Sequence, residues 1–106
     1  MLDTIKDGEK LIVRLSGELD HCVVTAMRAE LEELLLDKGI RHLHFDFENV
    51  SFMDSSGVGF IIGRYKTMAA RGGHVSAGNL HPPVDRLFRI GGLHRIVEIT
   101  EGQGGI

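Results

Sequence analysis

The stretch with the clearest chemistry runs from Ser51 to Gly59 and reads Ser-Phe-Met-Asp-Ser-Ser-Gly-Val-Gly. Two hydroxyls, Ser55 and Ser56, follow the acid Asp54 and precede two glycines. Oxygen atoms at such a place accept hydrogen bonds from the first free N–H groups of a helix. The positive end of the helix dipole also favours an added negative charge. The pattern therefore suits either an ordinary helix cap or a serine that receives a phosphate.

The residues after Gly57 predict the helix that positions these hydroxyls. Apolar side chains recur at the i, i+3, i+4, i+7 spacing of a buried helical face: Val58, Ile61, Ile62, Tyr65, Met68 and Ala69. Gly57, Gly59 and Gly63 each cost about 0.8–1.0 kcal/mol relative to Ala inside a helix. Gly59 and Gly63 are four residues apart and so share a face. We expect another backbone to come close there, either the domain's own or a partner's.

The rest of the chain predicts the sheet on which this helix rests. In residues 41–47, apolar side chains alternate with polar ones: Leu43, Phe45 and Phe47 against His42, His44 and Asp46. Such alternation predicts a strand with one buried face and one solvated polar face, so that helices cover only one side. Further strands are expected over 1–7, 11–15, 74–77 and 96–99, with helices over 23–38, 58–71 and 82–90. In the last helix, Val84, Leu87, Phe88 and Ile90 are expected to point inward.

The fold class that follows is α/β, a single mixed β-sheet with helices packed on one face, in the order ββαβαβαβ. The 106 residues, 42% of them hydrophobic and 25% charged, predict one domain over 1–106 with a flexible tail over 101–106. The net charge is −3, with 12 Lys and Arg against 15 Asp and Glu, and no basic run favours direct nucleic-acid binding.

Several features favour a cytoplasmic protein. No apolar stretch approaches 18 residues and the N-terminus lacks a basic-then-apolar leader, so we expect neither membrane insertion nor secretion. Cys22 is the only cysteine and cannot form an internal disulfide, which suits a reducing compartment. It lies near an apolar run, so we expect it to be a small buried hydrophobe.

Three enzyme-like sites receive weak support. His42 and His44 share a strand face but lack a third metal ligand at suitable spacing. The three glycines after Ser56 depart from G-x-G-x-x-G, since the third comes one position late, and the P-loop lysine is absent. The stretch around Ser55 lacks the first glycine of the G-x-S-x-G elbow, although a triad assembled in space stays open. No cofactor and no metal are expected, and a small serine- or metal-dependent hydrolase remains an alternative.

Five segments in order resemble the bacterial anti-anti-sigma factors of the STAS domain family. They are Gly17–Asp20, Ser51–Gly57, Gly63–Lys66, Pro82–Phe88 and Gly91–Leu93. The resemblance covers nearly the whole chain at similar spacing. One departure is the short glycine-rich C-terminus, where family members commonly add a helix. A STAS module that serves another regulatory ligand, a transporter or a stressosome is a further alternative.

The resemblance implies a phosphorylation switch. In such proteins the serine after the Asp is phosphorylated by the anti-sigma factor, itself an ATP-using serine kinase. Here that serine is Ser55, with Ser56 as second candidate. The unphosphorylated protein would bind the anti-sigma factor and release the sporulation sigma factor, and a serine phosphatase would reset the switch.

The same resemblance implies a set of partner-binding residues around this serine. They are Asp20, Asp54, Ser55, Ser56, Gly57, Val58 and Gly59. Asp54 either orients Ser55 or is a plain cap. Asp20 reaches the same end of the sheet if its strand lies beside 41–47, although capping its own helix is the simpler role. Val58, with Gly59 and Phe60, forms a candidate apolar contact unless it belongs to the core.

Overall fold

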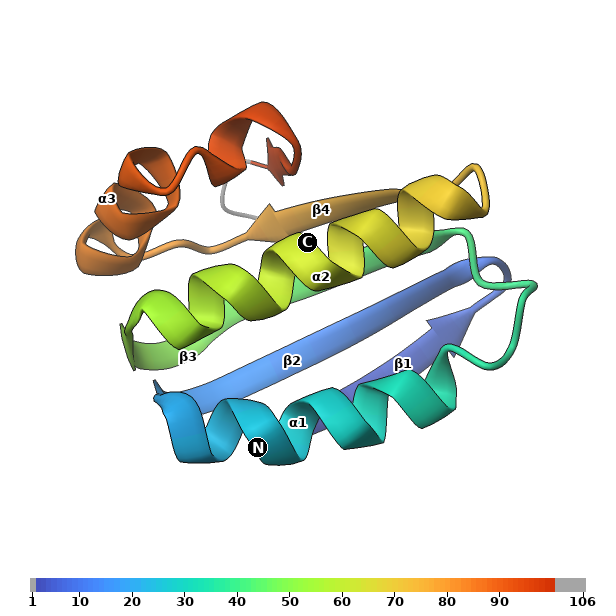
Figure 1. Ribbon diagram of the computed structural model, residues 1–106, viewed down its shortest axis with the longest axis horizontal. Coiled ribbons are helices and arrows are strands. Elements are labelled where there is room, and N and C mark those ends of the chain that lie inside the picture. The colour runs from blue at the N-terminus through green and yellow to red at the C-terminus, as the bar shows by residue number, and fades with distance from the viewer. Residues whose placement is uncertain (1, 101–106) are drawn as a thin grey trace.

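The alternating segment 41–47 becomes part of the central strand of a five-stranded sheet in the computed structural model, which describes residues 2–100 (Figure 1). The elements are β1 (Leu2–Asp7), β2 (Lys10–Leu19), α1 (His21–Leu34), β3 (His42–Met53), α2 (Ser55–Ala70), β4 (His74–Gly78), α3 (Pro82–Ile90), the 3-10 turn η1 (Leu93–Arg95) and β5 (Glu98–Thr100). The strands lie in the order β1-β2-β3-β4-β5, with β1 antiparallel to β2 and the other pairs parallel. The predicted element order and mixed sheet are confirmed.

The helices cover one face of this sheet, as the alternation predicts. Figure 1 shows α1 and α2 side by side across that face. Phe45 and Phe47 project into the layer beneath the helices, where the ring of Phe45 lies 5.9 Å from that of Phe60. The ring of Phe47 lies 5.4 Å from that of Phe88 in α3. All four rings are buried, so aromatic contacts hold α2 and α3 against β3.

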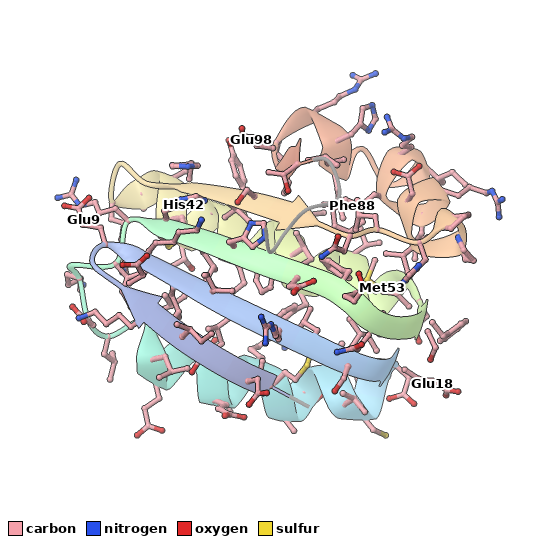
Figure 2. All side chains as sticks on the ribbon, turned by 180° about the vertical axis from the view of Figure 1, so that it is seen from behind. Glu9, Glu18, His42, Met53, Phe88 and Glu98 are labelled. Carbon is pink, nitrogen blue, oxygen red and sulfur yellow. The ribbon has the colours of Figure 1, made fainter. Side chains whose placement is uncertain are left out.

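The parallel pairing of β2 with β3 brings two helix starts together. Leu19, the last residue of β2, is paired with Met53, the last residue of β3. The next residues, Asp20 and Asp54, therefore begin α1 and α2 at the same edge of the sheet. Figure 2 shows the ends of both strands at this edge, where Glu18 and Met53 are labelled. The expected position of Asp20 is thus confirmed.

Several predicted boundaries are wrong. Helix α1 ends at Leu34 and not at Lys38, and the guanidinium of Arg71 binds the freed carbonyls of Leu35, Asp37 and Ile40 at 2.7–3.2 Å. Strand β3 continues to Met53 because β2 stays paired with it across two irregularities. The last strand is Glu98–Thr100, since the turn η1 occupies the preceding segment.

The buried face of α2 differs from the predicted one. The buried residues are Gly57, Phe60, Ile61, Arg64 and Met68, whereas Val58, Ile62 and Tyr65 are half-buried and Ala69 is exposed. Apolar residues occur on most sides of this helix, so periodicity alone did not define which side faces the sheet. The true face includes a glycine and an arginine that a count of apolar residues leaves out.

The sheet face away from the helices is not fully solvated. His44 and Asp46 are buried there, which contradicts the predicted solvated face. Asp46 Oδ1 accepts hydrogen bonds from Asn79 Nδ2 at 2.9 Å and from the Glu48 N–H at 3.0 Å. Because β3 is central, neighbouring strands supply side chains on both sides of it. The predicted flexible tail, 101–106, lies outside the described residues and stays a prediction.

Candidate functional site

The N-terminus of α2 presents an exposed serine beside a capped one. Asp54 precedes the helix with extended backbone, and its Oδ1 accepts a hydrogen bond from the Ser56 N–H at 2.8 Å. The Asp54 carbonyl accepts from the Gly57 N–H at 3.0 Å. Ser55 is the first residue of α2 and is exposed, while Ser56 is half-buried. Among residues 2–100, no group hydrogen-bonds to the Ser55 hydroxyl. This hydroxyl is therefore free for a reaction with an approaching group.

A second carboxylate lies at the same edge. Asp20 caps α1, since its Oδ1 accepts the Val23 N–H at 3.0 Å. A hydrogen bond joins the N-terminal ends of α1 and α2, because the Asp54 N–H donates to the Leu19 carbonyl at 3.4 Å. Both acids are half-buried caps, so the capping interpretation of Asp20 and Asp54 is confirmed. Their charges also make this edge negative, which matters for any anion placed on Ser55.

The glycines of α2 have different surroundings. A Cβ on Gly57 would collide with Met53 Cγ and lie 2.7 Å from its Sδ, so the domain's own packing needs this glycine. Gly59 and Gly63 have no atom within 4 Å of such a Cβ. No part of the described chain therefore requires the smooth strip at Gly59 and Gly63. That strip is open to another molecule.

An apolar surface that the sequence did not reveal adjoins the serine. Phe52 and Ile90 are exposed, and they border a hollow of about 230 Å³ with Met53, Pro83, Arg86 and Leu87. The end of α3 meets the first turn of α2, since a Cβ on Gly91 would lie 3.0 Å from Val58 Cγ1. We call Phe52, Val58, Pro83, Leu87 and Ile90 the α2–α3 apolar surface.

Two predictions about this surface are wrong. Ile90 was expected inside but is 76% exposed, because it lies at the end of α3 two residues beyond the buried Phe88. Phe60 was grouped with Val58 as a contact residue but is buried against Phe45. The signal for the surface was the pair of large apolar residues at element ends, Phe52 and Ile90. Phe52 and Ile90 could not be assigned to one surface until the packing of α3 against α2 was known.

The cysteine is also placed differently from expectation. Cys22 is exposed in the first turn of α1. It lies two residues before the buried Val24, hence about 200° around the helix from it. The expectation that Cys22 is a small buried hydrophobe is therefore wrong.

The histidine pair of β3 is far from the serine. His42 begins β3 and Met53 ends it, as their labels in Figure 2 show. His42 Nε2 lies 2.8 Å, and His44 Nδ1 2.7 Å, from the same Ser76 hydroxyl. Burial lowers the pKa of His42 to about 4, helped by His74 and Lys10, and burial also lowers the pKa of His44. Across residues 2–100, no group of three or more His, Cys, Asp or Glu could hold a metal ion.

Comparisons with known proteins agree with this architecture. A model of the STAS domain family matches residues 1–103. The anti-sigma F factor antagonist of Paenibacillus polymyxa is 41% identical over 93 residues, which are 88% of this chain and 80% of the relative. The anti-sigma factor antagonist SpoIIAA in its unphosphorylated form superposes with a TM-score of 0.85 at 30% identity, covering 99% of this chain and 92% of that one. Phosphorylated SpoIIAA of Bacillus gives 0.77 at 29%, covering 99% and 96%. In the described part of this chain, no helix is long and apolar enough to cross a membrane.

Proposed function

Because this chain belongs to the STAS domain family, we propose that it is an anti-sigma factor antagonist controlled by phosphorylation of Ser55. The unphosphorylated protein binds an anti-sigma factor that is also a serine kinase and thereby releases the sporulation sigma factor. Phosphorylation ends this binding, and a serine phosphatase restores it. The observation that carries the proposal is the exposed, unbonded Ser55 hydroxyl at the start of α2. Relatives named as anti-sigma factor antagonists support the regulatory role.

Ser55 is a better phosphate acceptor than Ser56. A kinase must bring its nucleotide close to the hydroxyl oxygen, which needs an open approach. Ser55 is exposed, whereas Ser56 is half-buried and its N–H is held by Asp54. A phosphate adds about −1.5 to −2 charge and three acceptor oxygens. On the first residue of a helix, such a charge stabilises the helix by about 0.3–1 kcal/mol.

The switch therefore acts without refolding. The phosphate leaves the domain's own contacts intact because the Ser55 hydroxyl has no bond to lose among the described residues. The resemblance of this fold to both forms of SpoIIAA supports a backbone that stays nearly the same. Amide chemical shifts that change across the whole sheet on phosphorylation would count against this.

Loss of binding follows from charge at the interface. A partner that covers Ser55 removes water from the phosphate beside the carboxylate of Asp54, with Asp20 at the same edge. Two unit charges about 4 Å apart at an effective dielectric near 20 interact by about 4 kcal/mol. That energy corresponds to roughly a thousandfold in affinity. The added bulk of the phosphate acts in the same direction.

The partner surface includes more than the serine. We place Asp20, Asp54, Ser55, Ser56, Gly57, Val58 and Gly59 in it, as the family resemblance led us to expect. The α2–α3 apolar surface extends this set through Val58. Large apolar residues next to a charged rim are typical of interface centres and supply most of the affinity. Gly59 adds an approach with no side chain in the way.

Phosphorylation is tested by incubating the protein with a purified anti-sigma kinase and ATP. Intact mass and peptide mapping are expected to show one phosphate, on Ser55. The Ser55→Ala variant is expected to bind the kinase but accept no phosphate, and the Ser56→Ala control to accept one. No transfer, or transfer to another residue, would contradict the assignment.

The apolar surface is tested by a matched pair of variants. Ile90→Ser is expected to weaken kinase binding tenfold or more, measured by calorimetry. Leu36→Ser is the control, since Leu36 is 73% exposed against 76% for Ile90 but lies in the turn that follows α1. Equal affinities of the two variants would remove the α2–α3 apolar surface from the interface.

We infer a regulatory protein of the cytoplasm rather than an enzyme. The serine hydrolase alternative gains no support, because no histidine within residues 2–100 hydrogen-bonds Ser55. The metal-dependent alternative gains none either, since His42 and His44 both use a ring nitrogen on Ser76.

A further inference from the structure

A buried arginine on α2 lacks partners for part of its guanidinium. Arg64 lies on the buried face of the helix and is only 8% exposed. Its Nε and Nη1 are buried without any hydrogen-bond partner. The third nitrogen, Nη2, is 3.7 Å from Glu32 Oε2, which is longer than a hydrogen bond. Burying polar N–H groups without acceptors is unfavourable, so part of the hydrogen-bonding capacity of this guanidinium is unused in the folded chain.

The neighbours of Arg64 do not neutralise it. Glu32 is its only ion-pair partner among the described residues, and the Glu32 side chain is 60% exposed, so its carboxylate is hydrated. The Phe60 ring lies 5.6 Å from the guanidinium carbon and contributes a weak cation–π attraction. Burial lowers the pKa of Arg64; the Glu32 carboxylate acts against this shift, and the positive charge of Arg28 adds to it. The net pKa is lowered, so the Glu32 carboxylate does not offset the burial of this guanidinium.

A cavity borders this arginine. It has a volume of about 260 Å³ and lies between the C-terminal halves of α1 and α2. Its polar lining comes from Glu32, Lys38, Arg64 and Thr67, and its apolar lining from Leu35 and Leu36. Arg71 also borders it, but that guanidinium is already bonded to three carbonyls. Of the two arginines that line the cavity, Arg64 is therefore the one with N–H groups that no acceptor in the described chain uses.

We propose that this cavity binds a small oxyanion, a carboxylate or phosphate group carried on a compact apolar body. A planar guanidinium matches such oxygens in a two-point hydrogen bond, and Lys38 adds a second positive charge. Leu35 and Leu36 contact the apolar body. The anion takes the place of the Glu32 carboxylate, whose exposed side chain is free to turn into solvent.

The site is separate from the serine switch. Arg64 follows Ser55 by nine residues, which is about 13 Å along the helix axis at 1.5 Å per residue. None of the cavity's lining residues belongs to the partner-binding set around Ser55. An anion bound at Arg64 is therefore compatible with either state of Ser55.

The test is an NMR titration of the ¹⁵N-labelled full chain with sodium butyrate and, separately, with inorganic phosphate. Sodium chloride at matched ionic strength is the control. The expected result is a saturable shift of the Arg64 Nε–H signal and of the Leu36 and Thr67 amides with at least one anion. Saturation with butyrate assigns a carboxylate with an apolar body, and saturation with phosphate assigns a phosphate group. Shifts that stay linear with both anions, as with chloride, would overturn the proposal.

Variants show whether Arg64 itself holds the anion. Arg64→Met keeps an apolar stem and is expected to lower the affinity at least tenfold, whereas the exposed control Arg86→Met changes it less than twofold. Glu32→Gln alters an exposed residue and is expected to raise the affinity severalfold by removing the competing carboxylate. This second variant keeps the test valid if Arg64→Met fails to fold. Unchanged affinity in Glu32→Gln, or in a folded Arg64→Met, would show that Arg64 has a structural role only.

Discussion

Acidification is expected to destabilise the fold through His42. Its ring is half-buried on the sheet face away from the helices and is stacked on His74 with 4.0 Å between ring centres. Its Nε2 lies 2.8 Å from the Ser76 hydroxyl, which also lies 2.7 Å from His44 Nδ1. One hydroxyl has a single proton, so it donates to one imidazole and accepts from the other. A positive charge placed on His42 by protonation therefore has no carboxylate in direct contact.

The sign and size of this destabilisation follow from the pKa of His42. Burial, with His74, Lys10 and His44, lowers the pKa of His42 from 6.5 to about 4. Between these values the unfolded chain binds a proton that the folded chain does not. The stabilisation is complete above pH 6.5 and is lost as the pH falls from 6.5 towards 4. The full shift corresponds to about 3.4 kcal/mol, of which about 2.4 kcal/mol is lost between pH 7 and pH 4.5. Because the ring is half-exposed, solvent screening reduces this to about 1–1.5 kcal/mol.

The assay is urea unfolding followed by circular dichroism at pH 7 and pH 4.5. Carboxylates also titrate in this range, so the relevant quantity is the difference between the wild type and His42→Gln. Glutamine can still hydrogen-bond Ser76 but binds no proton. We expect the variant to lose about 1–1.5 kcal/mol less than the wild type on acidification, and the exposed control His94→Gln to lose as much as the wild type. A His42 pKa near 6.5 by NMR, or equal losses in wild type and His42→Gln, would refute the reasoning.

Three further predictions concern stability. Gly57→Ala is expected to lower the free energy of unfolding by about 1–3 kcal/mol, because the new Cβ overlaps a neighbouring side chain. Gly59→Ala meets open space and is expected to raise it by up to about 1 kcal/mol, so equal effects in urea titrations would contradict the packing at Gly57. Asp54→Ala removes a helix cap and is expected to lower the free energy of unfolding by about 0.5–2 kcal/mol. Ser55→Ala is expected to change the unfolding midpoint little. A large loss of stability in Ser55→Ala would reveal a structural role for the hydroxyl. Phe88→Ala empties a buried ring site, for which calorimetry should show a loss of about 3–5 kcal/mol, and a loss below about 1 kcal/mol would place α3 outside the cooperative core.

Local patterns in the sequence predicted the architecture. The alternation in 41–47 specified the central strand and the side of the sheet that the helices cover. The Asp54-Ser55-Ser56 run specified a helix start with a free hydroxyl, because capping depends on residues only two or three positions apart. Glycines at 72–73 and 91–92 marked the ends of α2 and α3 for the same local reason.

Burial could not be predicted with the same success, since it depends on neighbours distant in the sequence. His44 and Asp46 had the polar pattern of a solvated face, yet Ser76 and Asn79 from the next strand segment bond them in a buried layer. Cys22 stands near apolar residues in the chain but points away from them, because the helix turns it outward.

The amino-acid sequence alone determined the candidate site, namely a hydroxyl at the positive end of a helix that follows a capping acid. Only the tertiary structure decided what surrounds that hydroxyl. Packing of α3 against the first turn of α2 assembled the apolar surface beside Ser55, and packing of α1 against α2 buried Arg64 next to a cavity. The physical reason is that hydrogen bonding along the chain is local, whereas the phase of a helix and the contents of a cavity depend on segments that meet only on folding.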